Sequence, residues 1–211
     1  MHKRISLLCI TIGAVLLISA LLLFGYNEWE SIQAGQASQD VLGQMKNIEA
    51  SAETGESTTD PSVLETDVQD ENETTDSGDT MTTVEINGYE YIGYLSIPSL
   101  DMELPIMSQW DYTRLAIAPC RQFGSVKGND LVIAGHNYRS HFGPLSRIAV
   151  GAEVTFTDMD GNVYTYTVTT TSVVAPEMVD AVENSGHDLV LYSCTYGGQT
   201  RHVVFCDKTE E

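Results

Sequence analysis

A cysteine and an arginine flank a glycine-rich segment in the stretch LVLYSCTYGGQTRHVVF, which runs from residue 189 to 205. Cys194 ends an apolar, strand-like run, and Arg201 begins the next one. A partly exposed thiol beside a cation favours the thiolate, which is the nucleophilic form. If the two runs pair as a hairpin, Arg201 lies close to Cys194, where a guanidinium can also hold a carbonyl or a developing oxyanion. A buried structural thiol and a solvated arginine are the alternatives, and this stretch alone does not decide.

A thiol nucleophile usually needs a general acid or base, most often a histidine. His136 directly follows the apolar run LVIAG and therefore also lies at a predicted strand end. His141 lies further into the following loop. His187 is at the far end of the Cys194 strand, roughly 23 Å away, and His202 follows the arginine in its strand, so it points to the opposite face. His136 is thus the strongest candidate.

The sequence favours neither a metal centre nor a redox pair of cysteines. His136 and His141 lack a third ligand, and the chain has no CxxC motif. Cys120, Cys194 and Cys206 follow the apolar N-terminal segment, and an odd number of cysteines outside the cell suggests one free thiol. Cys206 is predicted to be buried in a strand. A Cys120–Cys206 disulfide stays open, because sequence does not reveal its geometry.

Residues 1–26 predict a cytoplasmic stub and a transmembrane anchor. Residues 5–24 are 20 residues without a charge, and at about 1.5 Å per residue such a helix spans roughly 30 Å, the hydrocarbon thickness of a bilayer. Lys3 and Arg4 precede this run, so the positive-inside rule places the N-terminus in the cytoplasm and the rest outside the cell. A cleaved signal peptide is the alternative, but its apolar region usually has only about 7–15 residues.

Residues 27–83 predict a juxtamembrane segment and a disordered acidic linker. Apolar residues with helical spacing favour a helix between Tyr26 and Ile48. Residues 51–83 are rich in Ser, Thr, Asp, Glu and Gly and cannot bury enough apolar surface to fold, so we expect a tether that holds the next domain away from the membrane. The net charge of −20 argues against a nucleic-acid partner, because phosphate binding needs clustered Lys and Arg.

Residues 84–211 predict an all-β domain with short helices. Short runs rich in Val, Ile, Tyr and Thr alternate with turn residues, and the Asp-Gly in DMDGN at 158–162 is a strong hairpin signal. This pattern is typical of a barrel or sandwich. The expected strands are Tyr91–Ile97, Glu103–Met107, Asp130–Ala134, Glu153–Thr157, Val163–Ser172, Asp188–Ser193 and Arg201–Cys206, with an eighth near Arg121–Val126. Helical pieces are expected at Tyr112–Ile117, Pro144–Ile148 and Pro176–Asn184.

Together these motifs resemble the sortase family. A strand ending in Gly-His-Asn at 135–137, a strand ending in Ser-Cys-Thr at 193–195 and an arginine that begins the next strand occur in this order. The segment IGYLSIPSLDMELPIM at 92–107 fits the start of such a domain, and the resemblance covers about residues 90–208. It implies a closed β-barrel of about eight strands. It also implies a cysteine transpeptidase on the outer face of Gram-positive bacteria, anchored by an uncleaved N-terminal helix.

The resemblance assigns roles to individual residues. It makes Cys194 the nucleophile, His136 the general acid and base, and Arg201 the group that holds the substrate carbonyl or oxyanion. Ser193 stands where the family often has threonine, and the segment between Cys194 and Arg201 is short for the family, which leaves the subclass open. The predicted substrate-binding residues are Ser193, Asn137 and Thr195.

The implied reaction is a two-step acyl transfer. The thiolate attacks a backbone carbonyl in an LPxTG-like sorting motif of a secreted protein, and an amine of a cell-wall precursor or a pilin then attacks the thioester. Residues 173–187 are predicted to form a mobile cover over the peptide. No cofactor or metal is expected. Two alternatives stay open: a non-catalytic, membrane-tethered β-barrel that binds a partner, and a thiol peptidase that releases its product to water.

Overall fold

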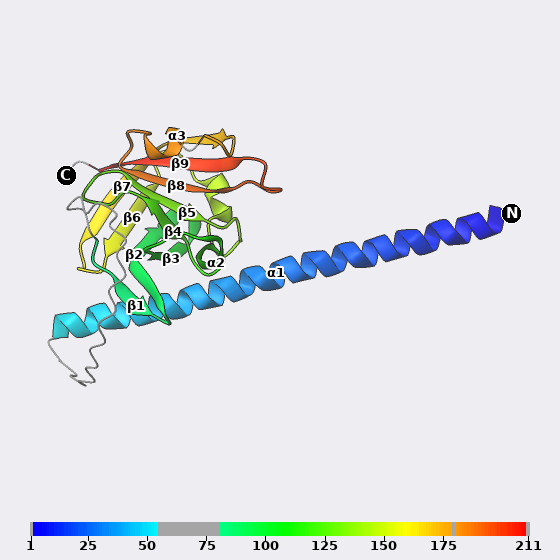
Figure 1. The fold of residues 1–211 in the computed structure, drawn as a ribbon, viewed down its shortest axis with the longest axis horizontal. Helices are drawn as coiled ribbons and strands as arrows, with labels where there is room; N and C mark the ends of the chain where they lie inside the picture. The colour runs from blue at the N-terminus through cyan, green and yellow to red at the C-terminus, as the bar shows by residue number, and fades with distance from the viewer. Residues whose placement is uncertain (1, 55–80, 179, 210–211) are drawn as a thin grey trace, which may run out of the picture.

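The chain forms one long N-terminal helix and a β-barrel that lies beside the C-terminal half of this helix (Figure 1). The computed structural model describes residues 2–54, 81–178 and 180–209. The helix, α1, is continuous from His2 to Thr54. The strands are β1 (Val84–Ile86), β2 (Tyr89–Ile97), β3 (Met102–Met107), β4 (Cys120–Phe123), β5 (Leu131–Gly135), β6 (Glu153–Asp158), β7 (Val163–Val174), β8 (Leu189–Cys194) and β9 (Arg201–Lys208).

Eight of these strands close into a barrel. The order in the sheet is β1-β2-β3-β4-β5-β8-β9-β7-β6, and β6 pairs back onto β2. β1 forms a hairpin with β2 and adds to the outside of the ring. Closure leaves no exposed edge among the ring strands, which is how small β-domains avoid edge-to-edge association. The predicted closed barrel of about eight strands is therefore confirmed.

Parallel pairing in the middle of the sheet explains two runs that do not alternate between apolar and polar residues. β5 reads LVIAG and β8 reads LVLYSC, and the two strands are parallel neighbours. Leu191 of β8 faces the barrel interior, and Val190 packs into a second cluster on the outer face, under Val182. Strands covered on both faces are apolar on both faces, which gives the continuous runs.

Strand positions agree with the sequence, and most differences are at the ends. The eighth strand expected near residues 121–126 is β4, which begins one residue earlier and ends at Phe123. The predicted Asp-Gly hairpin joins β6 to β7. The short helices are η1 (Pro98–Leu100, not predicted), α2 (Tyr112–Leu115), η2 (Gly143–Arg147) and α3 (Asp180–Glu183), of which η1 and η2 are 3₁₀ helices.

The N-terminal part of α1 is an exposed apolar helix. Its large apolar side chains from Ile12 to Phe24 are all exposed to solvent. By length and composition, α1 contains one candidate membrane span, within Ile12–Ala50. A continuous helix crosses the boundary predicted at residue 26, where the run contains Gly25 but no proline.

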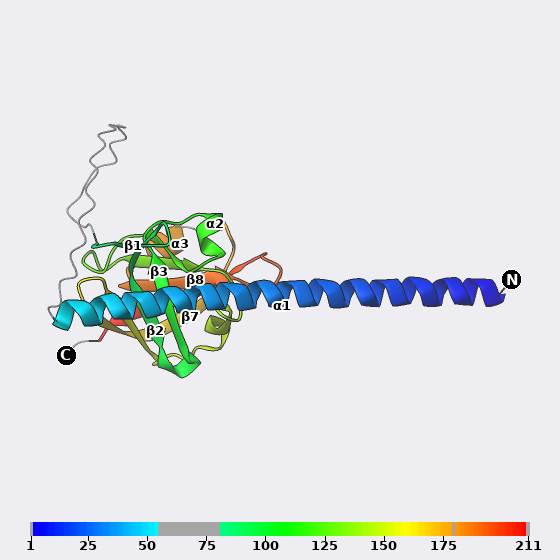
Figure 2. The ribbon, with the colours of Figure 1, turned by 90° about the horizontal axis from the view of Figure 1, so that it is seen from below.

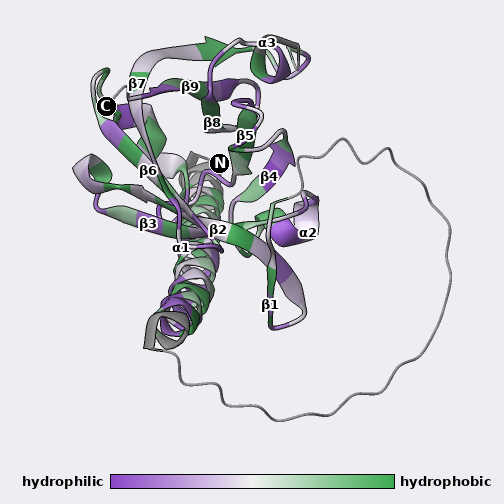
Figure 3. Cartoon of the chain, turned by 90° about the vertical axis from the view of Figure 1, so that its left-hand side faces the viewer, coloured by the Kyte–Doolittle hydropathy of each residue, from purple (hydrophilic) through white to green (hydrophobic). Residues whose placement is uncertain are grey.

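The C-terminal part of α1 packs against the barrel beside β3 (Figures 2 and 3). The helix expected between Tyr26 and Ile48 is present as part of α1, but three of its apolar side chains lie largely in the open: Trp29, Ile32 and Ile48 are 55%, 51% and 43% exposed. Small side chains form much of the contact instead, because they let the helix backbone come close to the barrel. The buried residues are Ser31, Ala34, Ser38, Val41, Leu42 and Met45.

The structure describes only part of the segment that is expected to form a tether. Residues 51–54 belong to α1, and most of the segment predicted to be disordered, 55–80, lies outside the described residues. Residues 31–45 do not act as a spacer, because α1 contacts the barrel over this length. The tether predicted for residues 51–83 stays a prediction, because most of this segment lies outside the described residues.

Candidate active site

Strands β5 and β8 bring His136 and Cys194 to the same end of the barrel. The two strands are parallel neighbours, with Gly135 opposite Ser193. Cys194 ends β8 and His136 follows β5 directly, so each lies one residue beyond this registered pair. Neighbouring strands are about 4.8 Å apart, which sets the two backbones side by side.

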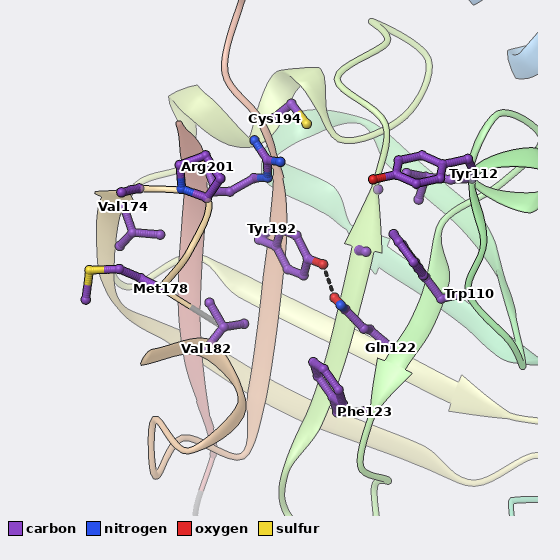
Figure 4. A pocket seen from close by; sticks show the side chains of 15 residues that line it. Trp110, Tyr112, Gln122, Phe123, Val174, Met178, Val182, Tyr192, Cys194 and Arg201 are labelled. Carbon is purple, nitrogen blue, oxygen red and sulfur yellow. Dashed lines mark hydrogen bonds between the residues drawn. The ribbon is translucent and has the colours of Figure 1, made fainter. Parts of the chain in front are cut away.

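The hairpin of β8 and β9 puts Arg201 directly opposite Cys194 in the strand register. Figure 4 shows the guanidinium of Arg201 extending toward Cys194. Nη1 of Arg201 donates hydrogen bonds to the carbonyl oxygens of Gly198, at 3.0 Å, and Thr200, at 3.2 Å. A guanidinium carries five N–H donors, so donors remain for a substrate oxygen.

Thr195 stabilises the short turn between the thiol and the arginine. Its backbone N–H donates to the carbonyl of Thr200 at 3.0 Å, and its hydroxyl lies 2.7 Å from the hydroxyl of Thr200. Gly197 and Gly198 adopt φ values of +86° and +72°, which glycine reaches without the penalty of a Cβ. These contacts allow the strand to reverse in six residues.

A groove of about 250 Å³ opens beside the thiol and the guanidinium. Its floor carries a hydrogen bond from the hydroxyl of Tyr192 on β8 to the carboxamide oxygen of Gln122 on β4 (Figure 4). Concave, mostly apolar surfaces with a few polar groups are typical of ligand sites. One wall comes from Trp110, Tyr112 and Leu115 after β3, and the other from the end of β7 and the segment after it, with Val174, Ala175, Pro176, Met178 and Val182.

His136 is half-buried, and it follows Gly135, which lines this groove, but does not line the groove itself. Its ring stacks on Tyr138, with the ring centroids 3.6 Å apart. Burial lowers the pKa of His136 below its usual range, and the negative charge of Glu30 on α1 opposes this shift. Nδ1 of His136 is buried and has no hydrogen-bond partner among the described residues.

The loop that carries His136 is fixed to the barrel by Phe142. The backbone N–H of Phe142 donates to the carbonyl of His136 at 3.0 Å. A Cβ on Gly135 would lie 2.3 Å from the Phe142 ring, so only glycine lets the ring pack there. His202 points away from the thiol face, as predicted, and its Nε2 lies 2.9 Å from the carbonyl of Leu145 in η2.

The predicted substrate-binding residues do not line the groove. Ser193 is 3% exposed, and its hydroxyl donates a long hydrogen bond of 3.5 Å to the carbonyl of Phe142. Asn137 is partly buried in the loop after His136, and Thr195 bonds within its own turn. Their role toward a substrate stays a prediction.

The cysteines differ sharply in their surroundings. Cys120 and Cys206 are buried free thiols, and burial raises the pKa of each to about 12. Both therefore stay protonated and unreactive at neutral pH. Cys194 is free and partly exposed. The disulfide left open by the sequence is not formed in this structure.

The sequence reasoning did not identify most of the groove. Trp110 and Tyr112 stand on either side of Asp111, which caps α2 by accepting a hydrogen bond from the backbone of Arg114. Two aromatic residues in a polar loop are a signal that could have identified this wall. Within the described residues, no group of three or more His, Cys, Asp or Glu side chains could hold a metal ion.

Comparisons with known proteins agree on one family. A family model described as the sortase domain matches residues 95–209. The chain is 30% identical over 129 residues to sortase A of Streptococcus agalactiae, covering 54% of this chain and 50% of that protein, so it spans about half of the relative's length.

Solved structures give the same result. Sortase C1 of S. agalactiae aligns with a TM-score of 0.52 and 26% identity, over 60% of this chain and 72% of that one. A Clostridium perfringens sortase C, solved with the C-terminal cell wall sorting motif, aligns with a TM-score of 0.51 and 22% identity, over 57% of this chain and 71% of that one.

Proposed function

Because the chain belongs to the sortase family, we propose that it is a cysteine transpeptidase anchored to the outer face of a Gram-positive cell membrane. In this proposal it cleaves a C-terminal sorting motif of secreted proteins and transfers the acyl group to an amine of a cell-wall precursor or a pilin. The observation that carries the proposal is the strand register. Arg201 lies opposite Cys194, and His136 follows the neighbouring parallel strand at the same barrel end.

The first step forms a thioester. The thiolate of Cys194 attacks the scissile carbonyl, the C–N bond breaks, and His136 donates a proton to the leaving amine. Arg201 stabilises the negative charge that develops on the carbonyl oxygen. Burial lowers the pKa of His136, which makes its imidazolium a stronger acid but reduces the fraction of His136 that carries the proton at neutral pH.

The second step reverses the proton transfer. The acceptor amine attacks the thioester carbonyl, its proton passes to His136, and the C–S bond breaks to restore the thiolate. Attack by water at the same stage gives hydrolysis, so the outcome depends on how well the site admits an amine and excludes water.

The groove supports an extended peptide as the substrate. Its apolar and aromatic walls suit the aliphatic residues of an LPxTG-like motif, and the thiol and guanidinium lie at one end of it. The relative solved with a cell wall sorting motif supports the same class of substrate. Residues 173–187 carry one wall, and we propose that this segment adjusts around the bound peptide.

The membrane anchor is the apolar N-terminal part of α1. Lys3 and Arg4 precede the apolar run, and by the positive-inside rule they support a cytoplasmic N-terminus with the barrel outside the cell. Substrates that cross the membrane and remain attached to it would reach the enzyme on this side.

The full chain in detergent micelles tests the proposal with LPxTG-type peptides and an oligoglycine acceptor. Ligated product supports transfer, and cleavage alone supports a peptidase. The matched controls are Cys194→Ala, expected to abolish both products, and Cys206→Ala, which removes a buried thiol remote from the groove. If Cys194→Ala equals the wild type in every assay, the non-catalytic binding module is the better account.

A further inference from the structure

Helix α1 makes direct contact with the loop that carries His136. The hydroxyl of Ser38 donates to the carbonyl of Ile117 at 2.9 Å and lies 3.2 Å from Nε2 of His141. Ser38 and His141 are both fully buried. A buried polar contact of this kind holds two segments in one arrangement, because breaking it leaves unpaired groups away from water.

A second contact lies two turns earlier on the same helix face. The hydroxyl of Ser140 donates to the carbonyl of Ser31 at 2.6 Å. Gly35 faces Ser140 so closely that a Cβ on Gly35 would lie 2.7 Å from the Cβ of Ser140. Ser31, Gly35 and Ser38 therefore form a narrow strip against residues 140 and 141.

The opposite side of the same loop rests on the barrel. Phe142 packs on Gly135 and bonds to the backbone of His136, and its own carbonyl accepts from Ser193. The loop is thus enclosed between α1 and β8. Displacing the helix removes one of the two surfaces that fix the position of the His136 ring.

We propose that α1 is a positioning element of the active site: Ser31, Gly35 and Ser38 hold the 136–142 loop so that His136 can transfer protons to and from the substrate. The helix that anchors the enzyme is then also part of its catalytic architecture. This inference rests on the proposed role of His136. It assigns no chemical step to the helix residues.

The test uses the full chain in detergent micelles and the substitution Gly35→Ala, whose new Cβ pushes the helix and the loop apart. We expect kcat for peptide transfer to fall about 10- to 100-fold with KM nearly unchanged, since misplacement by about 1 Å is sufficient for such a loss. The matched control is Gly43→Ala on the same helix, where a Cβ meets nothing within 4 Å, and it keeps wild-type kcat.

A compensating substitution separates positioning from simple destabilisation. Ser140→Gly removes the Cβ that Gly35→Ala meets, so Gly35→Ala/Ser140→Gly recovers a large part of kcat. Ser38→Ala introduces no clash and keeps the chain folded, and it lowers kcat several-fold through the lost contact to His141. Wild-type kcat in both Gly35→Ala and Ser38→Ala, with both proteins folded, would overturn the inference.

The failure of the inference is distinct from failure of the proposed function. If Cys194→Ala and His136→Ala are inactive while Gly35→Ala matches the wild type, the transpeptidase stands and α1 is only an anchor. If Cys194→Ala retains full activity, the proposed function itself is wrong.

Discussion

A buried histidine makes the stability of this fold depend on pH. The side chain of His141 is fully buried between α1 and the barrel, and burial lowers its pKa to about 4, from 6.5. The native state therefore keeps His141 neutral, whereas the unfolded chain binds a proton below about pH 6.5. His141 contributes stability that is fully present above pH 6.5 and is lost as the pH falls toward 4.

The magnitude follows from the two pKa values. Each pH unit between them costs about 1.4 kcal/mol, so the free energy of unfolding falls by about 2 kcal/mol between pH 7 and pH 5, and by about 3 kcal/mol at pH 4. Because Nε2 of His141 lies 3.2 Å from the hydroxyl of Ser38, protonation of His141 acts at the contact between α1 and the barrel.

The assay compares the wild type with His141→Gln, a side chain of similar reach that never becomes charged. Urea unfolding of the full chain in micelles, followed by near-ultraviolet circular dichroism, gives the free energy at each pH between 7.5 and 4. The wild type should lose about 3 kcal/mol more than His141→Gln over this range. Parallel curves for the two proteins would refute the reasoning, because other titrating groups are common to both.

Three further outcomes follow from the structure. Glu30→Gln removes the charge that raises the pKa of His136, so His136 loses its proton at a lower pH. The decline of the transfer rate at high pH should therefore begin at a lower pH than in the wild type, and an unchanged pH profile would contradict this. Gly93→Ala sets a Cβ 2.0 Å from the carbonyl of Thr157 at a φ of +147°, and urea unfolding should show a loss of roughly 3 kcal/mol or more. The control is Gly161→Ala, where a new Cβ meets nothing within 4 Å, and it should lower the free energy of unfolding by about 1 kcal/mol. If Gly93→Ala and Gly161→Ala lose the same free energy, the contact with Thr157 does not matter. Tyr192→Phe removes the hydrogen bond to Gln122 in the groove floor. The KM for the peptide should rise several-fold, while iodoacetamide should alkylate Cys194 at the wild-type rate. A slower alkylation would show that the substitution acts on the thiol and not on the groove.

Local patterns were sufficient to predict the barrel and the relation between Cys194 and Arg201. The Asp-Gly turn predicted the hairpin of β6 and β7, and the glycine-rich segment after Cys194 predicted the hairpin of β8 and β9. Short turns of this kind join strands that pair with each other. The position of His136 beside Cys194 was harder. Two apolar runs that end in chemistry-bearing residues do not reveal that their strands are parallel neighbours, since this depends on the order of the whole sheet.

The contact between α1 and the barrel was not predictable from hydrophobic periodicity. Trp29 and Ile32 are the large apolar side chains in this part of the helix, yet they are exposed, and Ser31 and Ser38 are buried against the barrel. Small residues become buried when two backbones approach closely, and their hydroxyls are satisfied by partners distant in the sequence. The sequence of one segment carries no information about such partners. The groove wall formed by Trp110, Tyr112 and Leu115 was also not predicted, because it faces residues distant in the sequence, whereas the opposite wall lies in the 173–187 segment that was expected to cover the peptide.

The continuity of α1 sets the height of the reaction above the bilayer. Ser31, which contacts the 136–142 loop, lies seven positions after Phe24, the last residue of the apolar run. At about 1.5 Å per residue this is roughly 10 Å, which three residues of extended chain can span. If the apolar run spans the membrane as proposed, a substrate held in the same membrane must expose its cleavage site within a few residues of the lipid surface. The enzyme would then select substrates by the distance of the motif from the membrane as well as by its sequence.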